Sequence, residues 1–249
     1  MAEFDLTVKE EDRRWISANH PALTFSFGQD GVLDLSGDLN FRMLYKADKS
    51  GSIINPAEEH LSLGLLIKDS YQIKIKFKKG RDSNLPEVSE TGLRIETSSQ
   101  KWNRDKEDLH AYTDNVCCLC MKMEERENLP IGFNLPDFFH NLLTPFFYAQ
   151  SYFEENGSWP WGDYSHGVYG AFEWYFRKDK LSDEEKIEFI DFLKEKKVWV
   201  RTKELLSKGP IKADSSCICG RRKIKSCHPN VLLALWKMSR NMGDFRSEI

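Results

Sequence analysis

The chain has 249 residues, of which 40% are hydrophobic and 12% aromatic, and its formal net charge is only -3. This composition supports a folded core and excludes extensive disorder, while the near-neutral balance gives no support for wholesale nucleic-acid binding. No segment approaches the roughly 18 apolar residues needed to cross a membrane, and the first residues lack the pattern of a secretion signal. We therefore expect a cytoplasmic protein with reduced cysteines and no contact with membranes or nucleic acids.

The first part of the chain predicts strands. Residues 1–20 are charged and polar, which indicates a helix or an arm, and from about residue 21 to 95 the sequence has a period of two. Successive side chains of a strand point to opposite faces of a sheet, so this period is typical of half-buried strands. We predict an antiparallel meander of about four strands, at 23–27, 32–35, 60–67 and 69–77, with loops over 36–60 and 80–108.

The alternation also predicts which face of the sheet is buried. One face carries Leu61, Leu63, Leu65 and Ile67 and then Ile73, Ile75 and Phe77, whereas the other carries Gln72, Lys74 and Lys76. We expect the apolar positions to meet the core and the lysines to form a solvated face, rather than a nucleic-acid patch.

From residue 135 onward the apolar period is that of helices. Residues 135–155 predict a long apolar helix with Pro136 in its first turn. Pro145 is expected to kink or restart this helix, because proline removes one helical hydrogen bond. A short helix is expected at 171–176.

The last part of the chain predicts two more helices. Ser182 and Glu185 have the spacing of a capping box, so we expect a helix to begin there and to continue to about residue 200. Its inward face is expected at Ile187, Ile190 and Leu193, which keep helical spacing. A final helix is expected at about 229–241.

A group of potential metal ligands precedes that final helix. Cys217, Cys219, Cys227 and His228 form two close pairs that flank a basic loop, Arg221 to Lys225. Three cysteines and one histidine are the ligand set of a closed tetrahedral zinc site, which leaves no position for a catalytic water. We expect a structural Zn²⁺ here; the alternative is a set of free thiols on a surface loop. The basic loop could contact an acidic partner or a phosphate, or only keep the module soluble.

A second cysteine group lies in the middle of the chain, where Cys117, Cys118 and Cys120 follow His110. Adjacent cysteines of an extended chain point in opposite directions, so Cys117 and Cys118 are poor ligands for one ion. Cys118 and Cys120 would share a face, as two buried core residues also would, and free cysteine is among the most buried residue types. These residues alone leave three interpretations open: a buried core, a nucleophile or a metal site.

The order of segments over residues 20–177 resembles the ubiquitin-conjugating family, and in particular its stand-alone bacterial relatives. The chain reads "DSYQIKIKF", "LPEVSETGLRIE", "LHAYTDNVCCL" and then the Trp-rich segment "GSWPWGDYSHGVYG" after a helix. In that family a meander sheet ends in a proline-containing strand, followed by a loop marked by histidine, a Cys-Leu pair that carries the thioester, and helices. The zinc-ligand segment resembles the SEC-C type motif, although its inner loop is shorter and lacks Gly-Ser-Gly.

The resemblance places Cys118, before Leu119, on the thioester cysteine, and His110 on the histidine of the family's His-Pro-Asn turn. The chain departs from that turn, because Tyr112 stands where the family has the asparagine that steadies the oxyanion. His166 is a candidate substitute, either as a hydrogen-bond donor to the oxyanion or as a proton acceptor. Cys117 is then expected to be buried.

The resemblance implies an α+β fold, with an antiparallel four-stranded meander sheet and helices over residues 1–178. A helical extension over 179–249 would hold the zinc motif at 217–228. The implied activity is transfer of a ubiquitin-like modifier or another protein C-terminus, carried as a thioester, to an amine. Implied partners are the modifier, an activating enzyme and, in an anti-phage defence operon, a cyclic-oligonucleotide synthase. The alternative is an inactive scaffold of the same fold that binds partner proteins.

Overall fold

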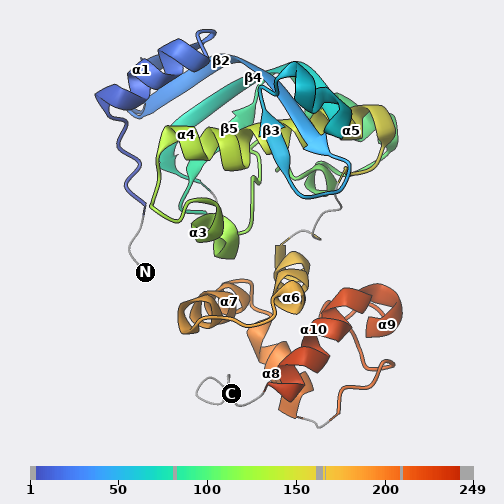
Figure 1. The fold of residues 1–249 in the computed structure, drawn as a ribbon. Coiled ribbons are helices and arrows are strands. Elements are labelled where there is room, and N and C mark those ends of the chain that lie inside the picture. Colours follow the sequence, from blue (N-terminus) through green and yellow to red (C-terminus); the bar gives the residue numbers. More distant parts are fainter. Residues whose placement is uncertain (1–3, 81–82, 161–164, 166, 208–209, 242–249) are drawn as a thin grey trace. The chain divides into compact units, whose positions relative to one another are not determined.

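The computed structural model describes residues 4–80, 83–160, 165, 167–207 and 210–241 (Figure 1). The chain forms two compact units, Ala2–Asp163 and Tyr164–Ile249. This division lies earlier than the one expected after residue 178. The difference concerns helix α6 (Gly167–Arg177), which packs against helix α10 (Pro229–Arg240) in the second unit.

The first unit is built on an antiparallel sheet, as the sequence predicts. Its strands are β1 (Leu23–Phe27), β2 (Leu33–Lys46), β3 (Ser52–Ile54), β4 (Gly64–Lys79) and β5 (Pro86–Glu90). They follow the order β1-β2-β4-β5, and β3 pairs with β2 beside this path. The expected strand at 23–27 is confirmed, and the sheet of the described residues has five strands rather than four.

Two strands are longer than predicted. β2 does not end near residue 35, and the segments expected as separate strands at 60–67 and 69–77 largely form the single strand β4. The two strands pair continuously from Asp34–Lys76 to Lys46–Gly64. Long-range pairing with β4 therefore makes residues 36–46, which were expected as part of a loop, a continuation of β2.

The predicted alternation is confirmed over residues 71–76 of β4. Ile73 and Ile75 are buried, while Gln72 is exposed and Lys74 and Lys76 are partly exposed. The prediction is wrong at the start of this segment. Glu58–Leu63 forms a short 3-10 helix, η1, and Leu61, Leu63 and Leu65 are exposed.

The predicted long helix is present and has an irregular turn. Asn134 caps α4 (Leu135–Phe138), which continues through a π-helical stretch, η4 (Phe139–Leu143), into α5 (Thr144–Asn156). Pro145 lies at the start of α5, so the helix restarts at this proline as predicted, because Pro145 cannot donate the regular hydrogen bond. α5 packs on β2 and β4 and closes the core of this unit (Figure 1).

Shorter helices surround the sheet and α5. The remaining helices of the first unit are α1 (Glu10–Asn19), α2 (Arg94–Trp102), η2 (Lys106–Leu109), η3 (Lys122–Glu124) and α3 (Glu125–Asn128). The sequence left a helix or an arm open for residues 1–20, where α1 lies, and it missed α2, which occupies part of the expected loop over 80–108.

The second unit is helical. Besides α6 and α10 it contains α7 (Asp183–Glu195), α8 (Trp199–Ser207) and α9 (Ile224–Cys227). The capping box is confirmed: Ser182 Oγ accepts the Glu185 N–H at 3.2 Å, and the Glu185 carboxylate accepts the Ser182 N–H at 2.7 Å. Among the described residues, no helix has the length and apolar character needed to cross a membrane.

The expected helix over 182–200 is two helices. Lys197 adopts a left-handed backbone conformation (φ 57°) and separates α7 from α8. The expected inward face is also partly wrong, because Ile187 is 58% exposed, whereas Ile190 and Leu193 are buried together with Phe189 and Phe192.

Candidate functional site

His110 and Cys118 form the two ends of a short hairpin, which we call the cysteine hairpin (residues 110–118). The Cys118 N–H donates to the His110 carbonyl at 2.8 Å, and Ala111 pairs with Cys117. At the tip, the Tyr112 N–H donates to the Val116 carbonyl at 2.8 Å. Asn115 next to it has a left-handed conformation (φ 63°), which asparagine tolerates better than most residues. The fold thus brings together two of the residues that the sequence singled out.

The cysteine hairpin is anchored to the edge of β5. The Cys117 N–H donates to the Val88 carbonyl at 2.7 Å, and the Glu90 N–H donates to the Asn115 carbonyl at 3.1 Å. Cys117 faces the core and is only 8% exposed, which confirms the prediction that it is buried. Burial, and then the nearby Glu90 carboxylate, raise the pKa of the Cys117 thiol. Cys118 follows on the extended chain and is partly exposed.

The strand does not continue to Cys120. The Cys118 thiol lies 3.8 Å from the Cys120 carbonyl oxygen, to which it can donate. Burial, followed by Glu125 and Glu124, raises the pKa of the Cys120 thiol. Among the described residues, His110 and these cysteines are not part of any group close enough to hold a metal ion. Of the three cysteines, Cys118 combines partial exposure with a fixed backbone position beside His110.

Trp159, which the sequence did not single out, packs against the His110 ring. The His110 ring meets the Trp159 indole edge-on, with ring centroids 5.3 Å apart, and Trp159 packs against Phe153 of α5 at 4.7 Å. His110 itself has a left-handed backbone conformation (φ 55°). The Trp-rich composition around residue 159 was a signal, but its contact with His110 is not visible in sequence. His166, the other catalytic candidate, lies outside the described residues.

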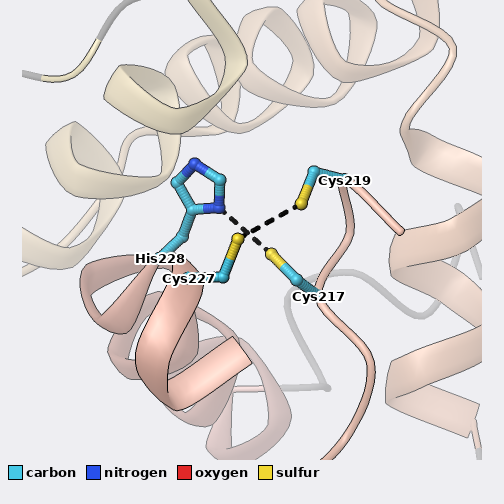
Figure 2. Close-up of side chains that lie close together, drawn as sticks. All are labelled: Cys217, Cys219, Cys227 and His228. Carbon is cyan, nitrogen blue, oxygen red and sulfur yellow. Dashed lines mark hydrogen bonds between the residues drawn. The ribbon is translucent and has the colours of Figure 1, made fainter. Parts of the chain in front are cut away.

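The second site is the cluster formed by Cys217, Cys219, Cys227 and His228, which we call the metal-ligand cluster. One ligand atom from each of the four residues lies within 4.8 Å of the others, so this group could hold a metal ion, as the sequence predicts. Cys217 Sγ is 3.1 Å from His228 Nδ1, and Cys219 Sγ is 3.4 Å from Cys227 Sγ. Figure 2 shows the four side chains converging on one point from a turn and from the end of a short helix.

The turn that carries the first two cysteines is tightly bonded. The Cys217 N–H donates to the Arg222 carbonyl at 2.8 Å, and the Gly220 N–H donates to the Cys217 carbonyl at 2.9 Å. Gly220 takes a left-handed conformation (φ 74°), which glycine adopts without strain. We call this segment, residues 216–223, the ligand turn.

Three members of the metal-ligand cluster have pKa values that depart from their ordinary values. Burial raises the pKa of the Cys217 thiol to about 12. At Cys219 burial acts in the same direction, but backbone N–H groups of Arg221 and Arg222 and the neighbouring thiols lower the pKa overall. Burial lowers the pKa of His228, which favours the neutral imidazole that a metal requires. Thiolates and a neutral imidazole are the donors of a soft or borderline metal.

Helix α6 supports the cluster from outside. The Tyr169 ring stacks on the His228 ring, with centroids 3.8 Å apart and an angle of 13° between planes. The buried Glu173 carboxylate accepts from Asn230 Nδ2 at 2.9 Å and from Ser165 N–H at 2.7 Å. Sequence spacing did not indicate Tyr169 or Glu173, because both residues lie far from the metal ligands along the chain.

Comparison with family models, with curated proteins and with solved structures gives no match for this chain. The cysteine hairpin and the metal-ligand cluster are therefore the features from which a function can be proposed.

Proposed function

We propose that the chain is an acyl carrier of the ubiquitin-conjugating type, with Cys118 as the residue that holds the thioester. The observation that supports this most is the hydrogen bond from Cys118 N–H to the His110 carbonyl, at 2.8 Å, within a hairpin anchored to β5. This hydrogen bond fixes the backbone of the partly exposed Cys118 beside that of His110, while the side chain of Cys117 is buried in the core. The antiparallel sheet, the hairpin and the helix α5 occur in the order that the family resemblance implies.

The proposed reaction has two steps. The Cys118 thiol gives up its proton, and its thiolate attacks the acyl carbon of a thioester on an activating enzyme. A new S–C bond forms, the old S–C bond breaks, and the leaving thiolate takes up a proton. An amine of the acceptor then attacks the same carbon, loses a proton and releases the Cys118 thiolate. Both exchanges need positioning and a site for the oxyanion more than strong acid–base chemistry.

Each supporting residue has a proposed role. His110 positions Cys118 through its backbone carbonyl, and Trp159 fixes the His110 ring. His166 is proposed, on the sequence alone, as a donor to the oxyanion in place of the missing asparagine. The proposed partners are a ubiquitin-like modifier or another protein C-terminus, an activating enzyme and a cyclic-oligonucleotide synthase. The setting is the cytoplasm of a bacterial cell that uses the system in defence against phage.

We further propose that the metal-ligand cluster holds a structural Zn²⁺. Cys217, Cys219, Cys227 and His228 would supply all four tetrahedral positions, and bound zinc would stabilise the fold of the second unit. The ligand set resembles a SEC-C type motif.

The alternative proposal is an inactive scaffold of the same fold. It is favoured by one observation: Tyr112 stands where the family has asparagine, and its N–H is already used in the hairpin by the Val116 carbonyl. A chain without an oxyanion donor would bind partners without transferring an acyl group.

Alkylation in the native state separates the two proposals. The full chain, loaded with zinc, is treated with iodoacetamide, and modification of each cysteine is followed by peptide mass spectrometry. A carrier requires Cys118 to react at least about tenfold faster than Cys117, because only an accessible thiol that can ionise is nucleophilic. The same mapping in denaturant is the control and should make the two rates similar. If native Cys118 reacts no faster than Cys117, the carrier proposal fails and the scaffold is left.

A further inference from the structure

The two units carry opposite charge. Residues 2–163 contain 18 lysines and arginines against 27 aspartates and glutamates, a net charge of -9, whereas residues 164–249 contain 18 against 12, a net charge of +6. The net charge of the whole chain is small because the acidic first unit offsets the basic second unit. Charge asymmetry of this kind is typical of chains that bind a polyanion.

The basic residues are densest at the end of the ligand turn and just after it. Arg221, Arg222, Lys223 and Lys225 are all exposed. Lys223 and Lys225 share one carboxylate, Asp214, at 3.4 and 2.8 Å. Within the part of the chain that the structure describes, Arg221 and Arg222 have no ion pair, so their charges are available to a ligand. Guanidinium groups bind phosphate in a planar, bidentate way that a lysine does not reproduce.

The two arginines stand on a hydrogen-bonded turn. The Arg222 carbonyl accepts from the Cys217 N–H at 2.8 Å, and the backbone N–H groups of both arginines lower the pKa of the Cys219 thiol. The sulfurs of the same turn are ligands of the proposed metal. Ordering the turn in advance lowers the entropy that binding must offset.

Aromatic surface lies on the same module. The Tyr169 ring, which is partly exposed, stacks on His228. Arg221 is near enough to Tyr169 to oppose the rise that burial causes in the pKa of its hydroxyl. A cationic pair beside a stacked aromatic platform suits a ligand with both phosphates and bases. An acidic peptide would use the arginines and leave the aromatic platform without a partner, so nucleic acid is the better fit.

We propose that the second unit, Tyr164–Ile249, binds nucleic acid without sequence specificity, with Arg221 and Arg222 on its phosphates and Tyr169 beside a base. This replaces, for the second unit, the expectation of no nucleic acid that the charge of the whole chain suggested. It is independent of the chemistry proposed for Cys118.

Fluorescence anisotropy with the full, zinc-loaded chain tests the proposal. The probes are labelled single-stranded RNA, single-stranded DNA and duplex DNA of about 20 nucleotides or base pairs, at about 50 to 200 mM KCl. We expect binding that weakens with salt. Arg221→Ala with Arg222→Ala should weaken it at least about tenfold and reduce the slope of log K against log salt by about 2, because each arginine is expected to neutralise one phosphate.

Three controls make the test decisive. Lys180→Ala with Lys194→Ala removes the same charge from exposed sites elsewhere in the unit and should have a smaller effect. Arg221→Lys with Arg222→Lys keeps the charge and should keep most of the salt slope. Zinc content and circular dichroism establish that each variant is folded. No binding at the lowest salt, or equal losses of affinity in the alanine pair and its control, would overturn the proposal. Equal competition by poly-glutamate would overturn it too, in favour of an acidic protein partner.

Discussion

His20 is a partly buried histidine whose surroundings disfavour its charge. Its ring lies between Trp15, at 5.2 Å, and Phe139, at 4.6 Å, and its Nδ1 is buried without a hydrogen-bond partner among the described residues. Burial, and then the nearby His140, lower its pKa from 6.5 to about 4. The unfolded chain therefore binds a proton at a pH where the folded chain does not.

This difference predicts how stability depends on pH. The contribution of neutral His20 is fully present above about pH 6.5 and is lost as the pH falls toward 4, because protonation then favours the unfolded state. Between about pH 7 and pH 5 we expect the free energy of unfolding to fall by about 1 to 2 kcal/mol more in the native chain than in His20→Phe. Urea unfolding at both pH values measures it; parallel pH dependence in the two proteins would refute the assignment.

Tyr169 is the residue that most directly orients His228. We expect Tyr169→Ala to weaken zinc binding roughly tenfold, as removal of a group that supports a metal ligand does, because the imidazole is then free to rotate away from Cys217. Tyr169→Phe keeps the stacked ring and should bind zinc nearly as well as the native chain. Competition with a chromophoric chelator gives both affinities. If the alanine and phenylalanine variants behave alike, stacking does not orient His228.

At the scale of elements, the end of α5 depends on a glycine. Gly157 has φ 65°, and a Cβ there would lie 2.6 Å from the Trp102 ring. Trp102 cannot move away freely, because its Nε1 donates to the Glu154 carbonyl at 3.2 Å. The contact joins the end of α2 to the end of α5.

Gly157→Ala is therefore expected to cost more stability than a left-handed backbone alone requires. Gly132→Ala is the matched control, since Gly132 also has a positive φ, 96°, but has open space around it. We expect a loss of about 1 kcal/mol at Gly132 and about 2 to 4 kcal/mol at Gly157, by chemical unfolding. Equal losses would show that Trp102 yields without cost.

Elements with strong local patterns were predictable, and those made by distant contacts were not. The capping box of α7 and the proline restart of α5 follow from neighbouring residues, and both are confirmed. Helix α2, with the sequence RIETSSQKW, has only two large apolar residues, Ile95 and Trp102. Its first residue, Arg94, pairs with Asp69 of β4 at 2.8 Å and with Glu154 of α5 at 2.7 Å. Those contacts join segments 25 and 60 residues apart, so no local pattern reveals them.

At the scale of the whole molecule, the same rule separates what could be predicted of the two sites. All four members of the metal-ligand cluster lie between residues 217 and 228, so their spacing was sufficient. The pairing of His110 with Cys118 also lies within one hairpin. Trp159 and Tyr169 come from other segments, and their contacts depend on tertiary packing.

Removal of the metal is predicted to affect one unit only. The buried apolar residues of the first unit's core lie between Ile16 and Phe153, and the partly buried ones packed against them lie between Phe4 and Trp159, far along the chain from the ligands. We expect a chelator to increase hydrogen exchange at the amides of α9 and α10, whereas β2 and β4 keep their protection, because metal binding is coupled to folding of its own unit. Cys219→Ser should reproduce the effect without chelator. Unchanged exchange in α10 would exclude a structural metal.

The most direct test of the central proposal is the intact mass of the chain after incubation with a ubiquitin-like modifier, its activating enzyme and ATP. We predict a gain equal to the modifier that a thiol reductant removes, absent in Cys118→Ala and retained in Cys120→Ala. In Cys118→Ser the gain should resist the reductant, since an oxygen ester replaces the thioester. A reducible gain that persists in Cys118→Ala would contradict the assignment of Cys118.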